Sequence, residues 1–148
     1  MRISILIPTF RRPESFLRAA RRALAQRGIG AFEVIGVDNT PEGSALALFR
    51  VLEAEAGERF RWRHEPAPGV ANARDAALQL ARGDYVAWLD DDQEAPPHWL
   101  TALFAQRQHT GAQSVFGPVT ACAPAGARHA GFFEQLYTRC GPAVSGLT

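Results

Sequence analysis

The sequence predicts an α/β fold in which helices alternate with the strands of a mainly parallel sheet. Short apolar runs of strand length alternate with longer segments whose apolar residues recur at helical spacing. This alternation is typical of right-handed βαβ units. The chain has 148 residues, of which 47% are hydrophobic and 21% charged, a composition that indicates one compact domain with its own hydrophobic core.

Each expected element follows from a local pattern. Residues 3–7 form an unbroken apolar run, which predicts a buried strand. A helix is expected over 14–27, because Pro13 suits a helix start, one face is apolar, and Gly28 ends the pattern. The later elements are a strand over 32–37, a helix over 44–56, a strand over 60–64, a helix over 71–82, a strand over 85–89, a helix over 97–110 and a strand over 114–119. The alternation is therefore expected over 1–119, with an irregular tail over 120–148.

Composition excludes several classes of function. The formal net charge is +1, so the whole chain carries no field that favours nucleic acid or an anionic membrane. All 16 basic residues are Arg, which excludes mechanisms that need a lysine. Cys122 and Cys140 lack the spacing of a metal site or a disulfide scaffold, so a reducing, cytoplasmic location is expected, with a peripheral position at the inner membrane face as the alternative. The apolar run before Pro8 is too short to cross a membrane, and no transmembrane segment is expected.

Three consecutive carboxylates, Asp90, Asp91 and Asp92, follow the strand expected over 85–89. Like charges at a strand end repel one another, and a hard cation such as Mg²⁺ held by oxygen ligands would offset them. Such an ion keeps open positions for substrate phosphates, so the motif indicates a phosphorylated or nucleotide substrate. The alternative is a solvated acidic turn before the helix that begins near Pro97.

Polar and Gly-rich segments also follow the other expected strands. They are Pro8, Thr9, Phe10, Arg11 and Arg12 after the first strand, Asp38, Asn39 and Thr40 after the second, and the segment from Glu65 to Gly69 after the third. Ligands of open α/β sheets bind beyond the carboxyl ends of the strands. Each segment alone could be a turn or a solvated face, but together they indicate a binding site. The sequence has no G-x-G-x-x-G or Walker A motif, which disfavours dinucleotide and P-loop sites.

Three segments, taken in order, resemble the N-terminal, nucleotide-sugar-binding half of a family 2 glycosyltransferase with the GT-A fold. They are ISILIPTFRRPESFLRAARRAL, EVIGVDNTPEG and APGVANARDAALQLARGDYVAWLDDDQEAPPHWL. The resemblance implies a Rossmann-like three-layer sandwich that binds a nucleoside-diphosphate sugar with Mg²⁺ or Mn²⁺. It implies that Thr9 and Asp38 cradle the base and that Arg74 faces the nucleotide or a phosphate.

The acidic run matches the Asp-x-Asp metal motif of that family. By this resemblance Asp92 is the main metal ligand, and Asp90 is the second residue of the metal site. Asp90 and Asp91 would face the ribose or reach the cation through water. The substrate-binding set implied at this stage is Pro8, Thr9, Phe10, Arg11, Asp38, Asn39, Gly69, Arg74, Asp90 and Asp91. The chain departs from the family pattern at Asn39, where a second acid is common, and at Asp75 and Ala77 in the Ala-Arg-Asn-x-Gly helix start.

The resemblance also implies an inverting transfer in which a carboxylate base deprotonates the acceptor hydroxyl. That base would lie in a downstream acceptor half, so the chain is expected to be a truncated donor domain with no catalytic base. Glu134, the one acid after Glu94, is a poor candidate. Apolar surface around Phe132, Phe133 and Leu136 is expected to be exposed. The alternatives are a catalytically incomplete nucleotide-sugar- or partner-binding module and a sugar-phosphate nucleotidyltransferase, although the latter would carry a Gly-rich phosphate loop and a functional lysine.

Overall fold

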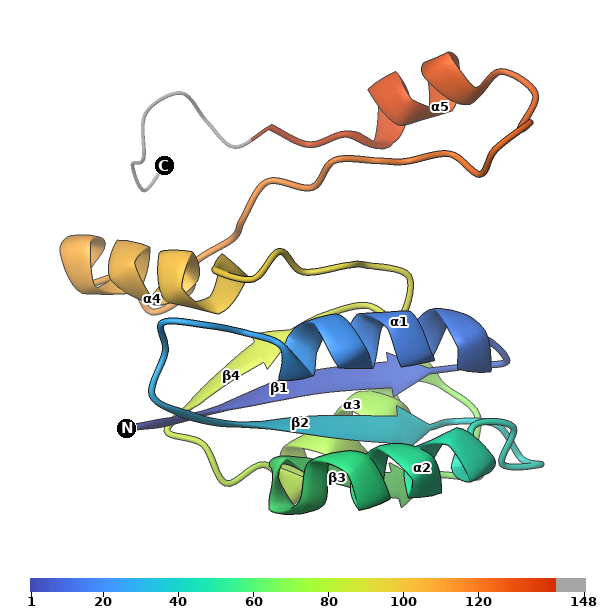
Figure 1. Ribbon diagram of the computed structural model, residues 1–148, viewed down its shortest axis with the longest axis vertical. Helices are drawn as coiled ribbons and strands as arrows, with labels where there is room; N and C mark the ends of the chain where they lie inside the picture. The colour runs from blue at the N-terminus through green and yellow to red at the C-terminus, as the bar shows by residue number, and fades with distance from the viewer. Residues whose placement is uncertain (141–148) are drawn as a thin grey trace. The chain divides into compact units, whose positions relative to one another are not determined.

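The computed structural model describes residues 1–140, which fall into two compact units, Met1–Ala102 and a second unit that starts at Leu103. The elements are β1 (Arg2–Thr9), α1 (Pro13–Leu24), β2 (Ala31–Asp38), α2 (Leu46–Ala56), the 3-10 turn η1 (Gly57–Arg59), β3 (Phe60–His64), α3 (Val70–Leu80), β4 (Tyr85–Trp88), α4 (Trp99–Thr110) and α5 (Ala130–Tyr137) (Figure 1). The predicted α/β class is confirmed. None of the helices in the described residues is long and apolar enough to cross a membrane.

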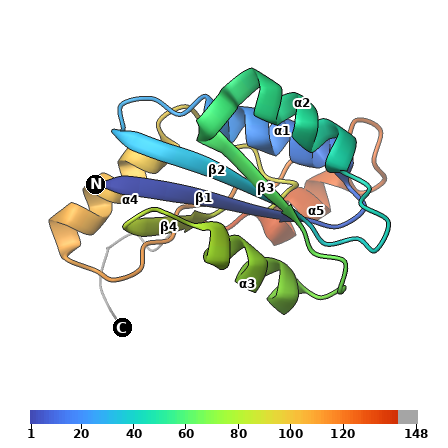
Figure 2. The same ribbon diagram turned by 90° about the horizontal axis from the view of Figure 1, so that it is seen from below.

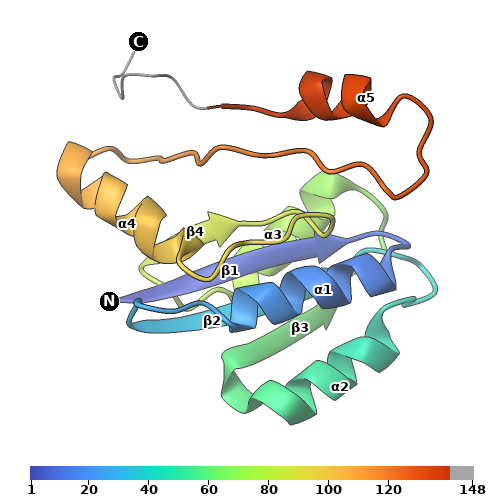
Figure 3. The same ribbon diagram turned by 45° about the horizontal axis from the view of Figure 1, so that its top comes forward.

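The first unit is built on a four-stranded sheet in the order β3-β2-β1-β4, and every neighbouring pair is parallel (Figure 3). The register aligns Thr9 with Asp38 and Asp38 with His64, so the carboxyl ends of three strands meet at one edge. Helices α1 and α2 cover one face of the sheet and α3 covers the other, which gives three layers (Figure 2).

Aromatic rings fill the layer between the sheet and the helices α1 and α2. Phe16, Phe49 and Phe60 are fully buried, and their ring centroids lie 4.8 to 6.4 Å apart. Gly36 in β2 lies beneath them, where an added Cβ would come within 2.8 Å of the Phe16 ring. The absence of a side chain at residue 36 therefore lets the aromatic rings of α1 and α2 pack directly on the sheet.

Small residues fill the opposite layer. Ala73, Ala76 and Ala77 of α3 pack on Leu6 of β1 and on Ile35 and Val37 of β2, all of them buried. Alanines at this spacing form one face of a helix, and their small size lets α3 approach the sheet closely.

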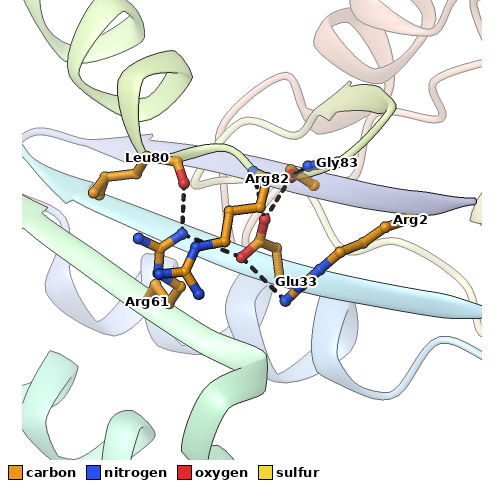
Figure 4. Close-up of polar contacts among 7 residues, drawn as sticks. Arg2, Glu33, Arg61, Leu80, Arg82 and Gly83 are labelled. Atoms are coloured by element: carbon orange, nitrogen blue, oxygen red, sulfur yellow. Dashed lines mark hydrogen bonds and ion pairs between the residues drawn. The ribbon is translucent and has the colours of Figure 1, made fainter.

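A buried carboxylate closes the amino-terminal end of the sheet. Glu33 is fully buried and accepts hydrogen bonds from Ser4 Oγ at 2.7 Å and from the backbone N–H of Arg82 at 2.8 Å. Arg2 and Arg61 add ion pairs at 3.5 and 3.4 Å (Figure 4). Burial alone would raise the pKa of Glu33, but the hydrogen bonds and the two guanidinium groups together hold this pKa below its ordinary value. The end of the sheet is thus joined by a satisfied, ionised group.

Strand β1 is longer than the predicted 3–7 and includes Pro8, although it lies inside the sheet. Leu6 accepts a hydrogen bond from the backbone N–H of Leu89, and the pairing with β4 reaches only to Leu6. Residues two apart in a strand face the same neighbour, so Pro8 faces β4 just beyond the last paired residue. Its missing N–H therefore breaks no bond of the sheet.

The second unit differs from its prediction in two ways. The strand expected over 114–119 is wrong, because residues 114–118 have no regular structure and Val119 makes only a single antiparallel bridge with Arg139. Gly117 and Pro118 interrupt the run, since Pro cannot donate to a sheet and Gly lacks a side chain to pack. The expected irregular tail contains helix α5, on which the exposure predicted for Phe132, Phe133 and Leu136 is confirmed. The last eight residues of that tail lie outside the described residues.

Candidate functional site

A buried hydrogen bond joins the carboxyl ends of β1 and β4. Thr9 Oγ1 donates to Asp91 Oδ2 at 2.6 Å, and both residues are nearly inaccessible to solvent. Thr9 is the last residue of β1, and Asp91 lies in the turn that follows β4. Asp91 therefore points inward and fixes the acidic turn against the end of β1.

Asp92 is exposed and forms an ion pair with Arg12. Arg12 Nη1 lies 3.0 Å from Asp92 Oδ2 and 3.5 Å from Asp91 Oδ1. The side chains of Arg12 and Asp92 are each 57% exposed, whereas that of Asp91 is only 11% exposed. The two acids thus share one guanidinium at the surface. The sequence analysis listed Arg12 in the polar segment after the first strand, with a solvated face as the alternative, and did not include it in the substrate-binding set.

Asp90 is exposed and is held by its own turn. The backbone N–H of Gln93 donates to the Asp90 carbonyl oxygen at 3.1 Å, and Gln93 Nε2 donates to Asp90 Oδ2 at 3.3 Å. Three neighbouring acids consequently have three environments: Asp91 is buried on Thr9, Asp92 is paired with Arg12, and Asp90 is open to solvent.

Asp38, at the end of β2, is fully buried, and both of its carboxylate oxygens are occupied. Oδ1 accepts hydrogen bonds from the Thr40 N–H at 3.0 Å and from Thr40 Oγ1 at 2.7 Å, while Oδ2 accepts one from the Ala45 N–H at 2.5 Å. These bonds satisfy backbone donors of the loop that leads into α2. The carboxylate therefore organises the β2–α2 loop.

Asn39 ties the end of β2 to the loop before α3. Its Nδ2 donates to the carbonyl oxygens of Glu65 at 2.9 Å and Ala67 at 2.8 Å, and its Oδ1 accepts from the Gly69 N–H at 2.8 Å. An amide both donates and accepts, which an ionised carboxylate cannot do. Asn39 thus fits this loop where an acid would not. Gly69 has φ of 143°, a conformation that L side chains rarely adopt, and it is the N-cap residue just before α3.

Two exposed arginines lie over aromatic rings near the same strand ends. The Arg74 guanidinium lies 5.3 Å from the Trp88 ring centroid, and that of Arg11 lies 5.2 Å from the ring of Phe10. Arg11 also has a left-handed backbone, with φ of 56°, and pairs with Glu42 at 3.2 Å. Such stacks hold a guanidinium in place while leaving its N–H groups accessible. Trp88 was not among the predicted site residues.

The donor set suits a hard divalent cation only in combination with a substrate. Asp92 and Asp90 offer exposed carboxylate oxygens, but residues 1–140 contain no group of three or more His, Cys, Asp or Glu arranged to hold a metal alone. One or two carboxylates completed by substrate phosphates is the usual way in which proteins bind Mg²⁺. The residues present therefore fit Mg²⁺ or Mn²⁺ as a partner of a phosphorylated ligand.

In the second unit, Glu134 Oε1 accepts a hydrogen bond from the Ala123 N–H at 2.8 Å.

Two solved structures share this fold. S. aureus TarS 1-349 in complex with UDP has a TM-score of 0.66 and 18% identity, and the match covers 84% of this chain and 38% of that one. The mannosyltransferase PcManGT from Pyrobaculum calidifontis, in complex with GDP-Man and Mn²⁺, has a TM-score of 0.60 and 22% identity, with 82% and 35% covered. These likenesses confirm the GT-A fold that the sequence predicts.

Sequence comparison gives the family. The succinoglycan biosynthesis protein ExoM of Rhizobium meliloti (strain 1021) is 37% identical over 124 residues, which cover 82% of this chain and 40% of that protein. The putative colanic acid biosynthesis glycosyl transferase WcaA of Escherichia coli (strain K12) is 32% identical over 107 residues, with 72% and 38% covered. The chain thus spans about 40% of the length of these relatives. The sequence profile of glycosyl transferase family 2 matches residues 4–130, and the chain therefore belongs to that family.

Proposed function

We propose that the chain is the donor-binding domain of a glycosyltransferase that uses a nucleoside-diphosphate sugar and transfers the sugar to an acceptor hydroxyl with inversion. The observation that carries this proposal is the convergence of the Thr9–Asp91 link, the exposed Asp92 and the loop held by Asn39 at one edge of a family 2 domain. Ligands of parallel sheets bind at this edge.

In this proposal the nucleotide base of the donor lies near the ends of β1 and β2, beside Pro8, Thr9 and Phe10. Asp38 contributes to binding the nucleotide base indirectly, by holding the β2–α2 loop, because its carboxylate is buried and fully hydrogen-bonded. Asn39 holds the loop before α3 through its hydrogen bond from the Gly69 N–H. The exposed guanidinium groups of Arg11 and Arg74 supply donors for the diphosphate, which planar guanidinium groups bind well.

Asp92, with Asp90, would hold Mg²⁺ or Mn²⁺, which when bound neutralises charge on the departing nucleoside diphosphate. Support comes from the carboxylate donor set and from membership of family 2. The mannosyltransferase PcManGT, which has a similar fold, was solved with GDP-Man and Mn²⁺. Asp91 contributes by anchoring the acidic turn on Thr9, so that its neighbours keep their position at the strand end.

The catalytic base that an inverting transfer requires is not assigned to any described residue. Glu134 is engaged by the Ala123 N–H within the second unit, which supports leaving it out of the chemistry. We therefore expect the 148-residue chain by itself to bind donor and to show at most slow donor hydrolysis, since a general base contributes about 10²–10⁴-fold to such reactions. A cytoplasmic location is proposed with this function, because nucleotide sugars are the expected ligands.

Calorimetry on the 148-residue chain tests the proposal. We expect UDP or GDP to bind more tightly with Mn²⁺ than without it, and Asp92→Asn to remove that metal dependence. Glu94→Gln is the matched control, because Glu94 is a nearby exposed acid that pairs with Arg18 and Arg22 instead of facing the strand ends. An equal metal dependence in Asp92→Asn and in the unchanged chain would refute the metal assignment. Absence of binding by either nucleotide would refute the donor site.

A further inference from the structure

Arg12 places a guanidinium group on the acidic turn formed by Asp90, Asp91 and Asp92. Its Nη1 lies within 3.5 Å of oxygens from two different acids, Asp92 and Asp91. The second oxygen of Asp91 is already taken by Thr9, and Asp90 is held by Gln93. The guanidinium therefore offsets part of the charge of three consecutive carboxylates.

We propose that Arg12 is an exchangeable counter-ion of the acidic turn: it pairs with Asp92 and Asp91 when the site is empty, and it passes to the donor diphosphate when a divalent cation takes its place. This inference rests on the proposed function and extends it to Arg12, a residue outside the substrate-binding set that the resemblance implies. Arg12 is a positioning residue in this scheme, since it controls when Asp92 is free to bind the metal.

Geometry supports the exchange. Arg12 Nη1 is bonded to Asp92 Oδ2 at 3.0 Å, the carboxylate that the proposed function gives to the metal. A divalent cation bound to the same carboxylate would be repelled by the positive charge of this guanidinium. The cation and the guanidinium therefore compete for Asp92.

The exposure of the ion pair supports the exchange as well. Both Arg12 and Asp92 are 57% exposed, so their ion pair is solvated and weak. Arg12 lies in the short connection between β1 and α1, and its backbone carbonyl accepts the first bond of the helix from the Phe16 N–H. The backbone is thereby fixed while the long side chain can turn, and a planar guanidinium is suited to two phosphate oxygens.

Neighbouring arginines do not share this arrangement. Arg11 is directed to Glu42 and Phe10, and Arg21 pairs with Glu55 on the α1–α2 side of the sheet. Arg21→Gln therefore removes the same charge from the first unit without touching the acidic turn, and it serves as the matched control.

The test measures two ligands on the 148-residue chain and its Arg12→Gln variant. Mn²⁺ alone, followed by electron paramagnetic resonance of the free ion, should bind about two- to five-fold more tightly to Arg12→Gln, the range set by the loss of a solvated ion pair. UDP or GDP in saturating Mn²⁺, followed by calorimetry, should bind about ten-fold more weakly, because a charged donor to the diphosphate is lost. Arg12→Lys should lie between the two chains, and Arg21→Gln should match the unchanged chain.

Opposite changes for the two ligands are the signature of the exchange. Equal Mn²⁺ affinity in Arg12→Gln and the unchanged chain, or changes of the same sign for Mn²⁺ and nucleotide, would overturn the inference. The tighter Mn²⁺ binding should also vanish when Arg12→Gln is combined with Asp92→Asn. If Asp92→Asn alone leaves metal-dependent nucleotide binding intact, the metal assignment within the proposed function fails; if it abolishes that binding and Arg12→Gln changes nothing, the inference alone fails. Thermal unfolding should confirm that the exposed substitutions leave the fold intact.

Discussion

The two ends of the sheet use the same chemistry for different purposes. At the amino-terminal end, Glu33 is buried and is satisfied by a hydroxyl, a backbone N–H and two guanidinium groups. At the carboxyl end, Asp92 is exposed and shares one guanidinium with Asp91. Removing a buried, fully paired group disturbs the fold, whereas an exposed and singly paired group can change partners. The contrast separates the stabilising acid from the proposed functional one.

The largest effect is expected from Glu33→Ala. The substitution leaves Ser4 Oγ and the Arg82 N–H without their acceptor and removes the partner of Arg2 and Arg61. We expect the free energy of unfolding in urea to fall by about 2–4 kcal/mol. Glu55→Ala, which removes an exposed partner of Arg21, should change it by less than about 0.5 kcal/mol. A similar small change for both variants would break the comparison.

Acid should weaken the same end of the sheet. The pKa of Glu33 in the folded chain lies below its ordinary value of 4.5, so the folded state favours the ionised form. Its stabilising contribution is complete above pH of about 4.5 and is lost as the pH falls through the lower folded pKa. Urea unfolding across this range should show a smaller acid-induced loss for Glu33→Gln than for the unchanged chain. Parallel pH profiles would assign the acid sensitivity to other groups.

A smaller loss is expected from Asp38→Ala, at the carboxyl end. The change leaves the N–H groups of Thr40 and Ala45 without acceptors, which should cost about 1–3 kcal/mol of unfolding free energy. Nucleotide binding should weaken with it, because the loop that Asp38 holds is part of the proposed base site. Asp38→Asn retains one acceptor and should lose less. Weaker nucleotide binding at unchanged stability would mean that the carboxylate contacts the donor directly.

The smallest stability effect is expected from Asp92→Asn. The ion pair that it removes is more than half exposed on both sides, so the free energy of unfolding should change by less than about 0.5 kcal/mol. Metal-dependent nucleotide binding should nevertheless be lost, as proposed above. This pairing of unchanged stability with lost binding is the opposite of the Glu33 result. A destabilisation as large as that of Glu33→Ala would contradict the functional assignment of Asp92.

Sequence patterns predicted the sheet and most of its helices, because buried strands and amphipathic helices leave a local record. The failed strand over 114–119 is instructive, since its apolar residues flank Gly117 and Pro118 and no strand within residues 1–140 pairs with them. The positions of Thr9, Asp38 and the three acids just after predicted parallel strands placed them at one edge. This pattern could not reveal the Arg12–Asp92 pair or the bond from Thr9 to Asp91, because both link residues about 80 positions apart. Side-chain direction at such distances depends on packing, which no local pattern encodes.

The strand order carries a consequence for how the protein folds. Strand β1 lies between β2, which follows closely in the chain, and β4, whose residues are translated much later. The β1–β2–β3 part can therefore assemble during synthesis while β4 is still absent, since nearby contacts form faster than distant ones. The links from Thr9 to Asp91 and from Arg12 to Asp92 form only when β4 docks. Donor binding consequently reports that the sheet is complete, and a folding intermediate lacking β4 would have no site to occupy.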